Sequence, residues 1–216
     1  MGIQKKIDKP AKQHLTLYSH PDSGHCYKVK LMMAIAGLAH DYQIIDINIP
    51  RPQRPESFRK LAKFGEVPLL TAGQQAYVQS NAILMFLANL TKKFGAENER
   101  LLSKVREWLF WEANRLGFSL PNLRYARRFA PQNYPAGAIS WIEGRYKTDI
   151  SRLDEELADG RTFITGERVT IADFSLCGYL FWAEQAEVDV PRKVQQWLQR
   201  ISKIPGWGHP DILLKE

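Results

Sequence analysis

Strand-like and helix-like segments alternate in the first part of this chain, and the alternation ends near residue 93. Up to that point the expected order of elements is β-α-β-α-β-β-α. From residue 100 onward, apolar residues recur only at helical spacing. This change predicts one α/β domain followed by one all-helical domain.

The first domain begins with a strand, a helix and a second strand. "LTLYS" (15–19) is β-rich, a helical pattern runs from Gly24 to a natural stop at Gly37, and "YQIIDINI" (42–49) is β-rich again. Such a unit implies parallel strands with a right-handed crossover. After a short helix, "VPLLTAGQQAYV" (67–78) predicts two strands and "QSNAILMFLANL" predicts a helix. Because the thioredoxin fold has this order, the expected fold class is an α/β thioredoxin-like N-terminal domain plus an all-α helical-bundle C-terminal domain.

Long helical patterns define the second domain. One helix is expected over residues 100–128, with a bend at Pro121. A second amphipathic helix is expected over residues 139–157. In "VTIADFSL", Thr170 and Asp173 occupy the two positions of a capping box, which marks a helix start and has a structural role.

Charge and composition narrow the classes of partner. The chain has 216 residues and a net charge of +7, and its first 14 residues hold four lysines against one aspartate. We interpret residues 1–13 as a disordered basic tail, 14–93 as the thioredoxin-like domain, 94–99 as a linker and 100–216 as the helical domain. Because basic and acidic residues are interleaved elsewhere, small anionic substrates are favoured over nucleic acid.

The hydropathy and the cysteine count indicate a cytoplasmic protein. No apolar run approaches the ~20 residues that cross a bilayer, and the first residues lack the apolar stretch of a secretory signal. Two cysteines form neither a disulfide framework nor a metal cluster. We therefore expect no membrane, no metal and no nucleic acid among the partners.

The loop "SHPDSGHCYKV" (19–29) contains the residues that could do chemistry. Ser23 immediately precedes the helical pattern, so its commonest role is that of an N-cap. The same geometry allows another role, because a helix N-terminus stabilises an anion above it. If that anion is a thiolate, a serine hydroxyl at this position can donate a hydrogen bond to it.

The other polar residues of the loop have weaker claims. Cys26 has no second cysteine at C-x-x-C spacing, which excludes a dithiol mechanism, and a lone cysteine is more often a packed small residue. A thiol in the first turn of a helix can nevertheless have a lowered pKa. His20 and His25 lack a carboxylate partner in the sequence, so we interpret them as surface or helix-start residues.

Four segments together resemble the cytosolic glutathione transferases. They are "LYSHPDSGHCYKV", "GEVPLL", "QSNAI" and "TIADFS", in the order and spacing of that family, over about residues 13 to 210. The resemblance is to the serine-type members, of the theta, zeta and delta kind. In those members the serine after the first strand stabilises the glutathione thiolate, and by position it matches Ser23 rather than Ser19.

The resemblance also implies the glutathione-binding residues. Pro68 is expected to be cis, and Val67 before it to pair its main chain with the cysteinyl residue of glutathione. Glu66 belongs to the same segment. Gln79 and Ser80 are expected to bind the γ-glutamyl group at the start of the third helix, although both can also serve as a helix cap.

Two departures from the family pattern stand out. Gln79 replaces the usual acid, so the amino group of glutathione loses an ionic partner. Near Gly65 the Asn-Pro and the Lys or His of many relatives are absent. Other cations are therefore candidates for the glycyl carboxylate: Arg51, Arg54 and Lys63.

The electrophile pocket is expected between the domains, along the helix at 100–128. Its candidates are Phe118, Arg124 and Tyr125, although an aromatic stripe is more often core than pocket. Arg124 and Arg128 are i,i+4 neighbours that could attract an anion, and we interpret them as part of a solvated face.

The expected function is that of a glutathione transferase, a soluble homodimer with glutathione as co-substrate and a role in detoxification. Residues around "ILMFLANL" could contribute to the dimer face. One alternative is glutathione-dependent reduction of disulfides or peroxides. Another is a catalytically decayed interaction scaffold of the same fold, an idea that Gln79 and the missing Lys or His favour.

Overall fold

The structure of this protein is a computed structural model that describes residues 14–216. The predicted basic tail at 1–13 lies outside the described residues.

A four-stranded mixed sheet forms the centre of the first domain. Its strands are β1 (Leu15–Ser19), β2 (Asp41–Ile44), β3 (Leu69–Ala72) and β4 (Gln75–Val78). They lie in the order β2-β1-β3-β4, with β1 parallel to β2 and antiparallel to β3. The parallel β1-α1-β2 unit and the β3-β4 hairpin confirm the predicted thioredoxin-like class.

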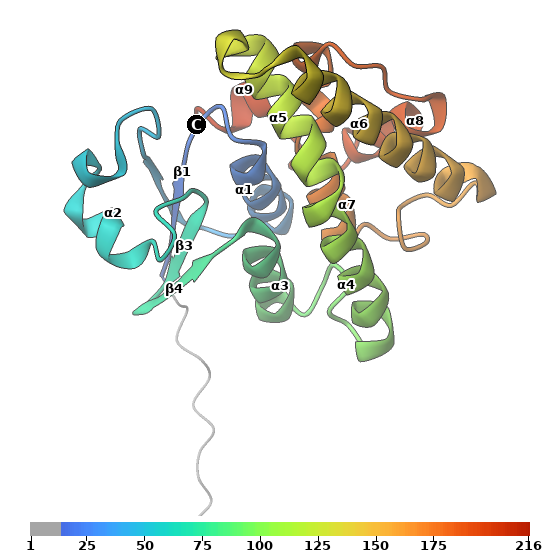
Figure 1. Ribbon diagram of the computed structural model, residues 1–216. Helices are drawn as coiled ribbons and strands as arrows, with labels where there is room; N and C mark the ends of the chain where they lie inside the picture. Colours follow the sequence, from blue (N-terminus) through green and yellow to red (C-terminus); the bar gives the residue numbers. More distant parts are fainter. Residues whose placement is uncertain (1–13) are drawn as a thin grey trace, which may run out of the picture.

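Helices cover both faces of this sheet. They are α1 (Gly24–Ala36) and α3 (Ser80–Thr91) on the face toward the second domain, and the short α2 (Glu56–Leu61) on the other (Figure 1). Gly37 ends α1 in the left-handed region, with φ 64°, as the stop signal predicted. The sheet and α1 therefore present the loop after β1 toward the helical domain.

Strand β2 is shorter than the predicted run 42–49. The backbone N–H of Asn48 donates to Oδ1 of Asp46 at 2.8 Å, which turns the chain out of the strand. Arg54 donates to the carbonyls of Ile47 and Ile49 at 2.9 and 3.3 Å. Side chains thus bind the backbone groups that a longer strand would use.

The second domain is helical. It comprises α4 (Glu99–Asn114), α5 (Leu116–Arg128), α6 (Ala136–Glu156), α7 (Ile171–Cys177), α8 (Arg192–Ile201) and α9 (Pro210–Leu213). In α7, Thr170 and Asp173 form the predicted capping box. The buried Asp173 carboxylate also accepts a hydrogen bond from Nε1 of Trp197 at 2.9 Å, so the cap joins α7 to α8.

The prediction of one long helix bent at Pro121 is wrong. The helix breaks at Arg115, where φ is −122° and ψ is −101°, and Pro121 lies inside α5. A Cβ atom at Gly117 would lie 2.3 Å from Oε1 of Glu112. The buried carboxylate of Glu112 thus occupies the space beside the break, where only glycine leaves room.

Candidate active site

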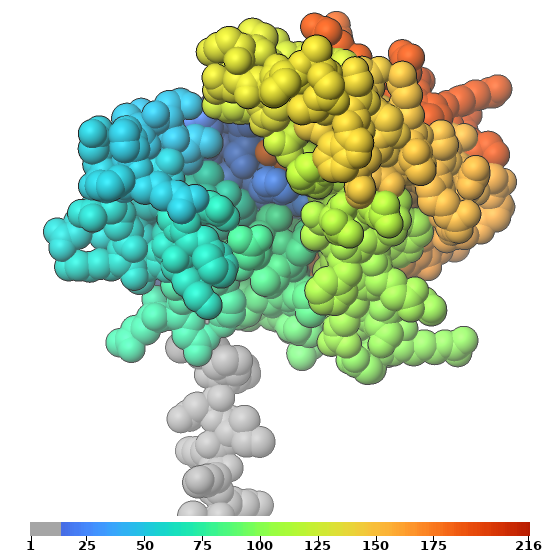
Figure 2. All heavy atoms as spheres, viewed as in Figure 1, coloured from blue at the N-terminus to red at the C-terminus, as the bar shows by residue number. Residues whose placement is uncertain are grey.

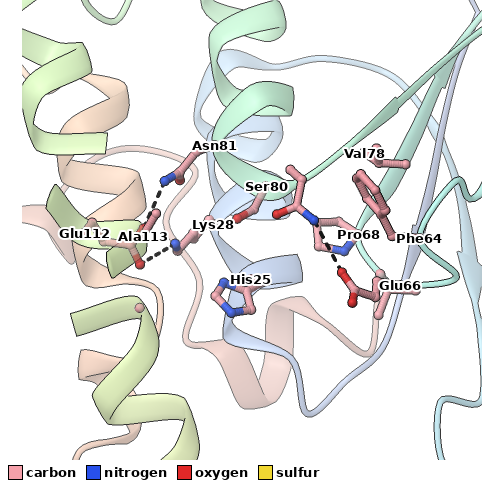
Figure 3. A pocket seen from close by; sticks show the side chains of 13 residues that line it. His25, Lys28, Phe64, Glu66, Pro68, Val78, Ser80, Asn81, Glu112 and Ala113 are labelled. Carbon is pink, nitrogen blue, oxygen red and sulfur yellow. Dashed lines mark hydrogen bonds and ion pairs between the residues drawn. The ribbon is translucent and has the colours of Figure 1, made fainter. Parts of the chain in front are cut away.

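A hollow separates the two domains, with the start of α1 at its floor (Figure 2). It contains a cavity of about 520 Å³, here called the Ser23 cavity, between the loops of the first domain and α5. A second cavity of about 230 Å³, the Ser80 cavity, lies at the start of α3 and faces α4 (Figure 3). Both cavities are lined by His25, Glu66 and Val67.

Ser23 is the N-cap of α1. Its Oγ accepts a hydrogen bond from the backbone N–H of Cys26 at 3.2 Å, and its side chain lines the Ser23 cavity. The N-cap prediction is confirmed. Because a capping oxygen acts as an acceptor, the hydroxyl hydrogen remains available to a ligand. The two roles considered for Ser23 are therefore compatible.

Cys26 and His20 are buried beside Ser23. Burial raises the pKa of the Cys26 thiol, although the neighbouring hydroxyl groups of Ser23 and Ser19 act in the opposite direction. His20 is not the surface residue that we expected, because its Nδ1 accepts a hydrogen bond from the backbone N–H of Asp22 at 3.1 Å. Burial lowers the pKa of His20, so it is a neutral acceptor that shapes the loop.

The segment at 66–68 and the start of α3 form one wall of the Ser80 cavity. The Val67–Pro68 peptide bond is cis, as the resemblance implied. Gln79 has φ 71°, a strained left-handed backbone for a residue with a side chain, and its side chain caps nothing. Its Nε2 donates instead to Oε2 of Glu66 at 3.3 Å (Figure 3). The carboxylate of Glu66 thus lies beside Gln79, the residue that replaces the acid expected from the resemblance.

A buried ion pair forms the inner end of the Ser80 cavity. Nζ of Lys28 lies 2.6 Å from Oε1 of Glu112, and these side chains are 1% and 4% exposed. Oε2 of Glu112 accepts hydrogen bonds from Asn81 and Ser175, each at 3.0 Å. Burial raises the pKa of Glu112, but the charge of Lys28 and the hydrogen bonds from Lys28 and Asn81 together keep this pKa below its usual value.

This ion pair was missed in the sequence analysis, although a signal was present. Glu112 continues the buried stripe of α4, after Leu102, Val105 and Leu109. A charged residue at such a position is almost never buried without a partner. The partner, however, lies 84 residues away in the sequence.

The three candidate cations for the glycyl carboxylate differ in their surroundings. Arg51 is exposed, lines the Ser23 cavity and forms an ion pair with Glu66 at 3.4 Å. Arg54 also lines it, but its guanidinium donates to backbone carbonyls, including that of Gly65 at 2.6 Å. Lys63 lines a neighbouring surface hollow instead. Only Arg51 thus combines access to the cavity with a solvent-exposed guanidinium.

The three candidates for the electrophile pocket differ in whether they line the Ser23 cavity. Arg124 and Tyr125 line the Ser23 cavity. Phe118 does not line it, and packs its ring against that of Trp141 at 6.0 Å. The interpretation of Arg124 as part of a solvated face is wrong, because its side chain is 3% exposed and donates to Asp22 and Gln185. Arg128 is exposed, as expected.

No helix within residues 14–216 is both long enough and apolar enough to span a membrane. Within the same residues, no group of three or more His, Cys, Asp or Glu side chains is arranged to hold a metal ion.

Comparison with known proteins identifies the family. Residues 17–93 match the model of the glutathione S-transferase N-terminal domain, and residues 122–200 match that of the C-terminal domain. Glutathione S-transferase 1 of Dianthus caryophyllus is 30% identical over 173 residues, which cover 76% of this chain and 75% of that protein. This chain belongs to the glutathione S-transferase family. The first match lies within the thioredoxin-like domain, and the second lies within the helical domain.

Two other proteins similar to this chain are named for different activities. The disulfide-bond oxidoreductase YfcG of Escherichia coli is 28% identical over 209 residues, which cover 90% of this chain and 93% of that protein. The crystal structure of a glutathione S-transferase from Pseudomonas fluorescens superposes with a TM-score of 0.79 and 27% identity, over 89% of this chain and 96% of that one. This chain is therefore similar both to a protein named as a transferase and to one named as a disulfide-bond oxidoreductase.

Proposed function

We propose that this chain is a glutathione transferase in which the Ser23 hydroxyl donates a hydrogen bond to the thiolate of bound glutathione. The observation that carries the proposal is the position of Ser23, which caps α1 at the floor of the cavity between the domains. The thiolate attacks an electrophilic small molecule, its sulfur forms the new bond to carbon, and a thioether results. The protein supplies thiolate stabilisation and proximity.

The energies of a hydrogen bond and a helix terminus suffice for this role. A free thiol has a pKa of about 8.5. Lowering it to about 6.5 requires about 2.7 kcal/mol. A hydrogen bond to a charged acceptor contributes about 1.5–3 kcal/mol. The N-terminus of α1 adds about 0.3–1 kcal/mol.

The two cavities offer positions for the parts of glutathione. We place the γ-glutamyl group in the Ser80 cavity against Ser80, with Glu66 beside Gln79 as the acid near its amino group. The cysteinyl backbone then lies along Val67, next to cis-Pro68, and the sulfur points toward Ser23. The glycyl carboxylate extends toward Arg51.

The remainder of the Ser23 cavity is the place for the electrophile. Tyr125 is half exposed there, with Phe129 beside it. The buried Arg124 shapes this wall through its contact with Asp22 rather than by offering a free charge. A substrate with an apolar, aromatic body suits such a wall.

We further propose a cytoplasmic homodimer. Helix α3 exposes Leu90, and α4 exposes Phe110, which is 74% accessible. We propose that these side chains belong to one contiguous apolar surface, the kind that marks a protein–protein interface. Sedimentation at two protein concentrations tests this proposal, since a monomer at both would contradict it.

Glutathione-dependent disulfide reduction is the second candidate, favoured by the similarity to the oxidoreductase YfcG. The same bound thiolate would attack a disulfide sulfur, forming a mixed disulfide and releasing a thiolate. Product analysis separates the two activities. A transferase forms a thioether, whereas a reductase forms a mixed disulfide, which a second glutathione thiolate converts into oxidised glutathione with release of the second substrate thiolate. A folded protein that fails to bind millimolar glutathione would instead be a scaffold.

The decisive experiment titrates the ultraviolet thiolate absorbance of bound glutathione with pH, for wild type and Ser23→Ala. A bound-thiol pKa well below the free value, which rises in Ser23→Ala, supports the proposal. Binding with an unshifted pKa leaves Ser23 as a helix cap and contradicts it.

A further inference from the structure

His25 has a side chain without hydrogen-bond partners in the described part of the chain. Its Nδ1 is buried and unpartnered, and no hydrogen bond from residues 14–216 reaches either ring nitrogen. Buried polar atoms in folded proteins are nearly always hydrogen-bonded. Because Nδ1 is enclosed by protein, a ligand in the cavities can reach the ring only through Nε2. The ring centroids of His25 and Tyr179 lie 5.1 Å apart in an edge-on arrangement. This contact packs the apolar surface of the imidazole but provides no hydrogen bond to its nitrogens.

His25 occupies the boundary between the two cavities. It lies in the first turn of α1, two residues after Ser23, and lines both the Ser23 cavity and the Ser80 cavity. Val67 lines both cavities as well. In Figure 3, His25 lies between Lys28 on one side and Pro68 on the other. A ligand that extends from Ser80 past Val67 toward Ser23 therefore has to pass the imidazole.

The surroundings of His25 favour a neutral ring. Burial and the charge of Lys28 lower the pKa of His25 to about 4, and the charge of Glu112 only partly offsets them. At neutral pH the ring therefore carries one proton. It is able to donate one hydrogen bond and has no net charge to neutralise an anion.

The position of that single proton follows from the same surroundings. An unpaired N–H donor in a protein interior is rarer than an under-used acceptor. The proton therefore belongs on Nε2, the nitrogen left to face the cavities.

We propose that Nε2–H of His25 is a second hydrogen-bond donor to the thiolate of bound glutathione, next to the hydroxyl of Ser23. This inference rests on the proposed function, because it assumes a thiolate between Val67 and Ser23. His25 remains neutral throughout, and the thiol proton leaves to solvent. Ser23, the N-cap, and His25, two residues later, then hold the sulfur at the start of α1.

Two substitutions of matched side-chain length distinguish hydrogen-bond donation by His25 from its contribution to packing. His25→Gln places an amide N–H close to the position of Nε2, whereas His25→Met has a similar length and no donor. The probes are glutathione and its sulfur-free analogue γ-glutamyl-2-aminobutyryl-glycine. The measurements are the ultraviolet thiolate titration of bound glutathione and the calorimetric affinity for the analogue.

We expect the pKa of the bound thiol to rise by about one pH unit in His25→Met, a tenfold loss of thiolate stabilisation, and to change little in His25→Gln. The affinity for the sulfur-free analogue should stay within about twofold of wild type in both variants, since only the sulfur contact changes. A thiol pKa in His25→Met equal to that of wild type would overturn the inference. An equal loss of affinity for both probes would also overturn it, because His25 would then support the site as a whole.

Failure of the proposed function has a different signature. If wild-type protein binds glutathione but leaves its thiol pKa at the free value, and Ser23→Ala behaves identically, the thiolate mechanism itself is wrong. The His25 inference falls with it. If Ser23→Ala raises the pKa and His25→Met does not, only the inference about His25 fails.

Discussion

Nη1 of Arg124 donates a hydrogen bond to the backbone carbonyl of Asp22 at 2.8 Å, and Nη2 lies 3.2 Å from the carboxylate of the same residue. Arg124 belongs to α5, and Asp22 immediately precedes Ser23. The guanidinium also stacks on the ring of Trp182 at 3.9 Å. The helical domain therefore holds the loop that carries the proposed thiolate donor.

Removal of this contact should impair catalysis more than it impairs glutathione binding. In Arg124→Met the loop at Asp22 loses its anchor, and a small displacement of Ser23 reduces thiolate stabilisation. We expect kcat/KM to fall by about tenfold or more. Arg124→Lys should not restore it, because one ammonium cannot replace the planar, forked donors. Steady-state kinetics with an aromatic electrophile provides the measurement.

Arg128→Met is the matched control for Arg124→Met. Arg128 lies one turn later on α5 and is exposed, so its loss should leave kcat/KM within about twofold of wild type. Equal losses in the two variants would show that helix charge, and not the anchor to Asp22, sets the activity.

Arg51 is expected to contribute to glutathione affinity. Its guanidinium lines the Ser23 cavity and has one exposed ion pair, which a glycyl carboxylate can replace. Arg51→Gln should raise the dissociation constant of glutathione by about three- to tenfold, as expected for one charge-assisted contact. Lys63→Gln serves as the control, because Lys63 lines a different hollow. If glutathione binds more weakly to Lys63→Gln but not to Arg51→Gln, Lys63 and not Arg51 binds the glycyl carboxylate.

Substitutions of Lys28 and Glu112 should have coupled effects on the free energy of unfolding. In Lys28→Met the carboxylate of Glu112 stays buried without its cation, and the free energy of unfolding should fall by about 3–5 kcal/mol. The double variant Lys28→Met/Glu112→Gln removes the charge as well, so it should be more stable than Lys28→Met alone. Urea unfolding of the three proteins measures both values. A double variant less stable than Lys28→Met would contradict the coupling.

Local signals in the sequence were sufficient for most of the fold. The strand before Ser23, the stop at Gly37 and the capping box of Thr170 and Asp173 each depend on residues within a few positions of one another. Such features are set by backbone geometry and by short-range hydrogen bonds. The family resemblance added the cis bond before Pro68, which no local pattern indicates.

The errors concern contacts between distant parts of the chain. The contact of Arg124 with Asp22 spans 102 residues, and helical spacing alone placed Arg124 on a solvated face. The helix breaks at Arg115, near the buried carboxylate of Glu112, whereas the helix breaker visible in the sequence was Pro121. The spacing of residues along one segment carries no information about which segment lies opposite.

The titration of His25 should make the protein less stable in mild acid. Its pKa is about 4 in the folded protein and 6.5 in an exposed site, so the unfolded chain binds more protons between these values. Stability therefore decreases as pH falls from about 6.5 toward about 4, and the contribution of His25 between pH 7 and pH 5 is about 2 kcal/mol. His25→Gln does not titrate in this range and should lose about 2 kcal/mol less than wild type over the same interval. Urea unfolding at pH 7 and pH 5 tests this, and equal losses in the two proteins would show that the ring of His25 is protonated without cost in the fold.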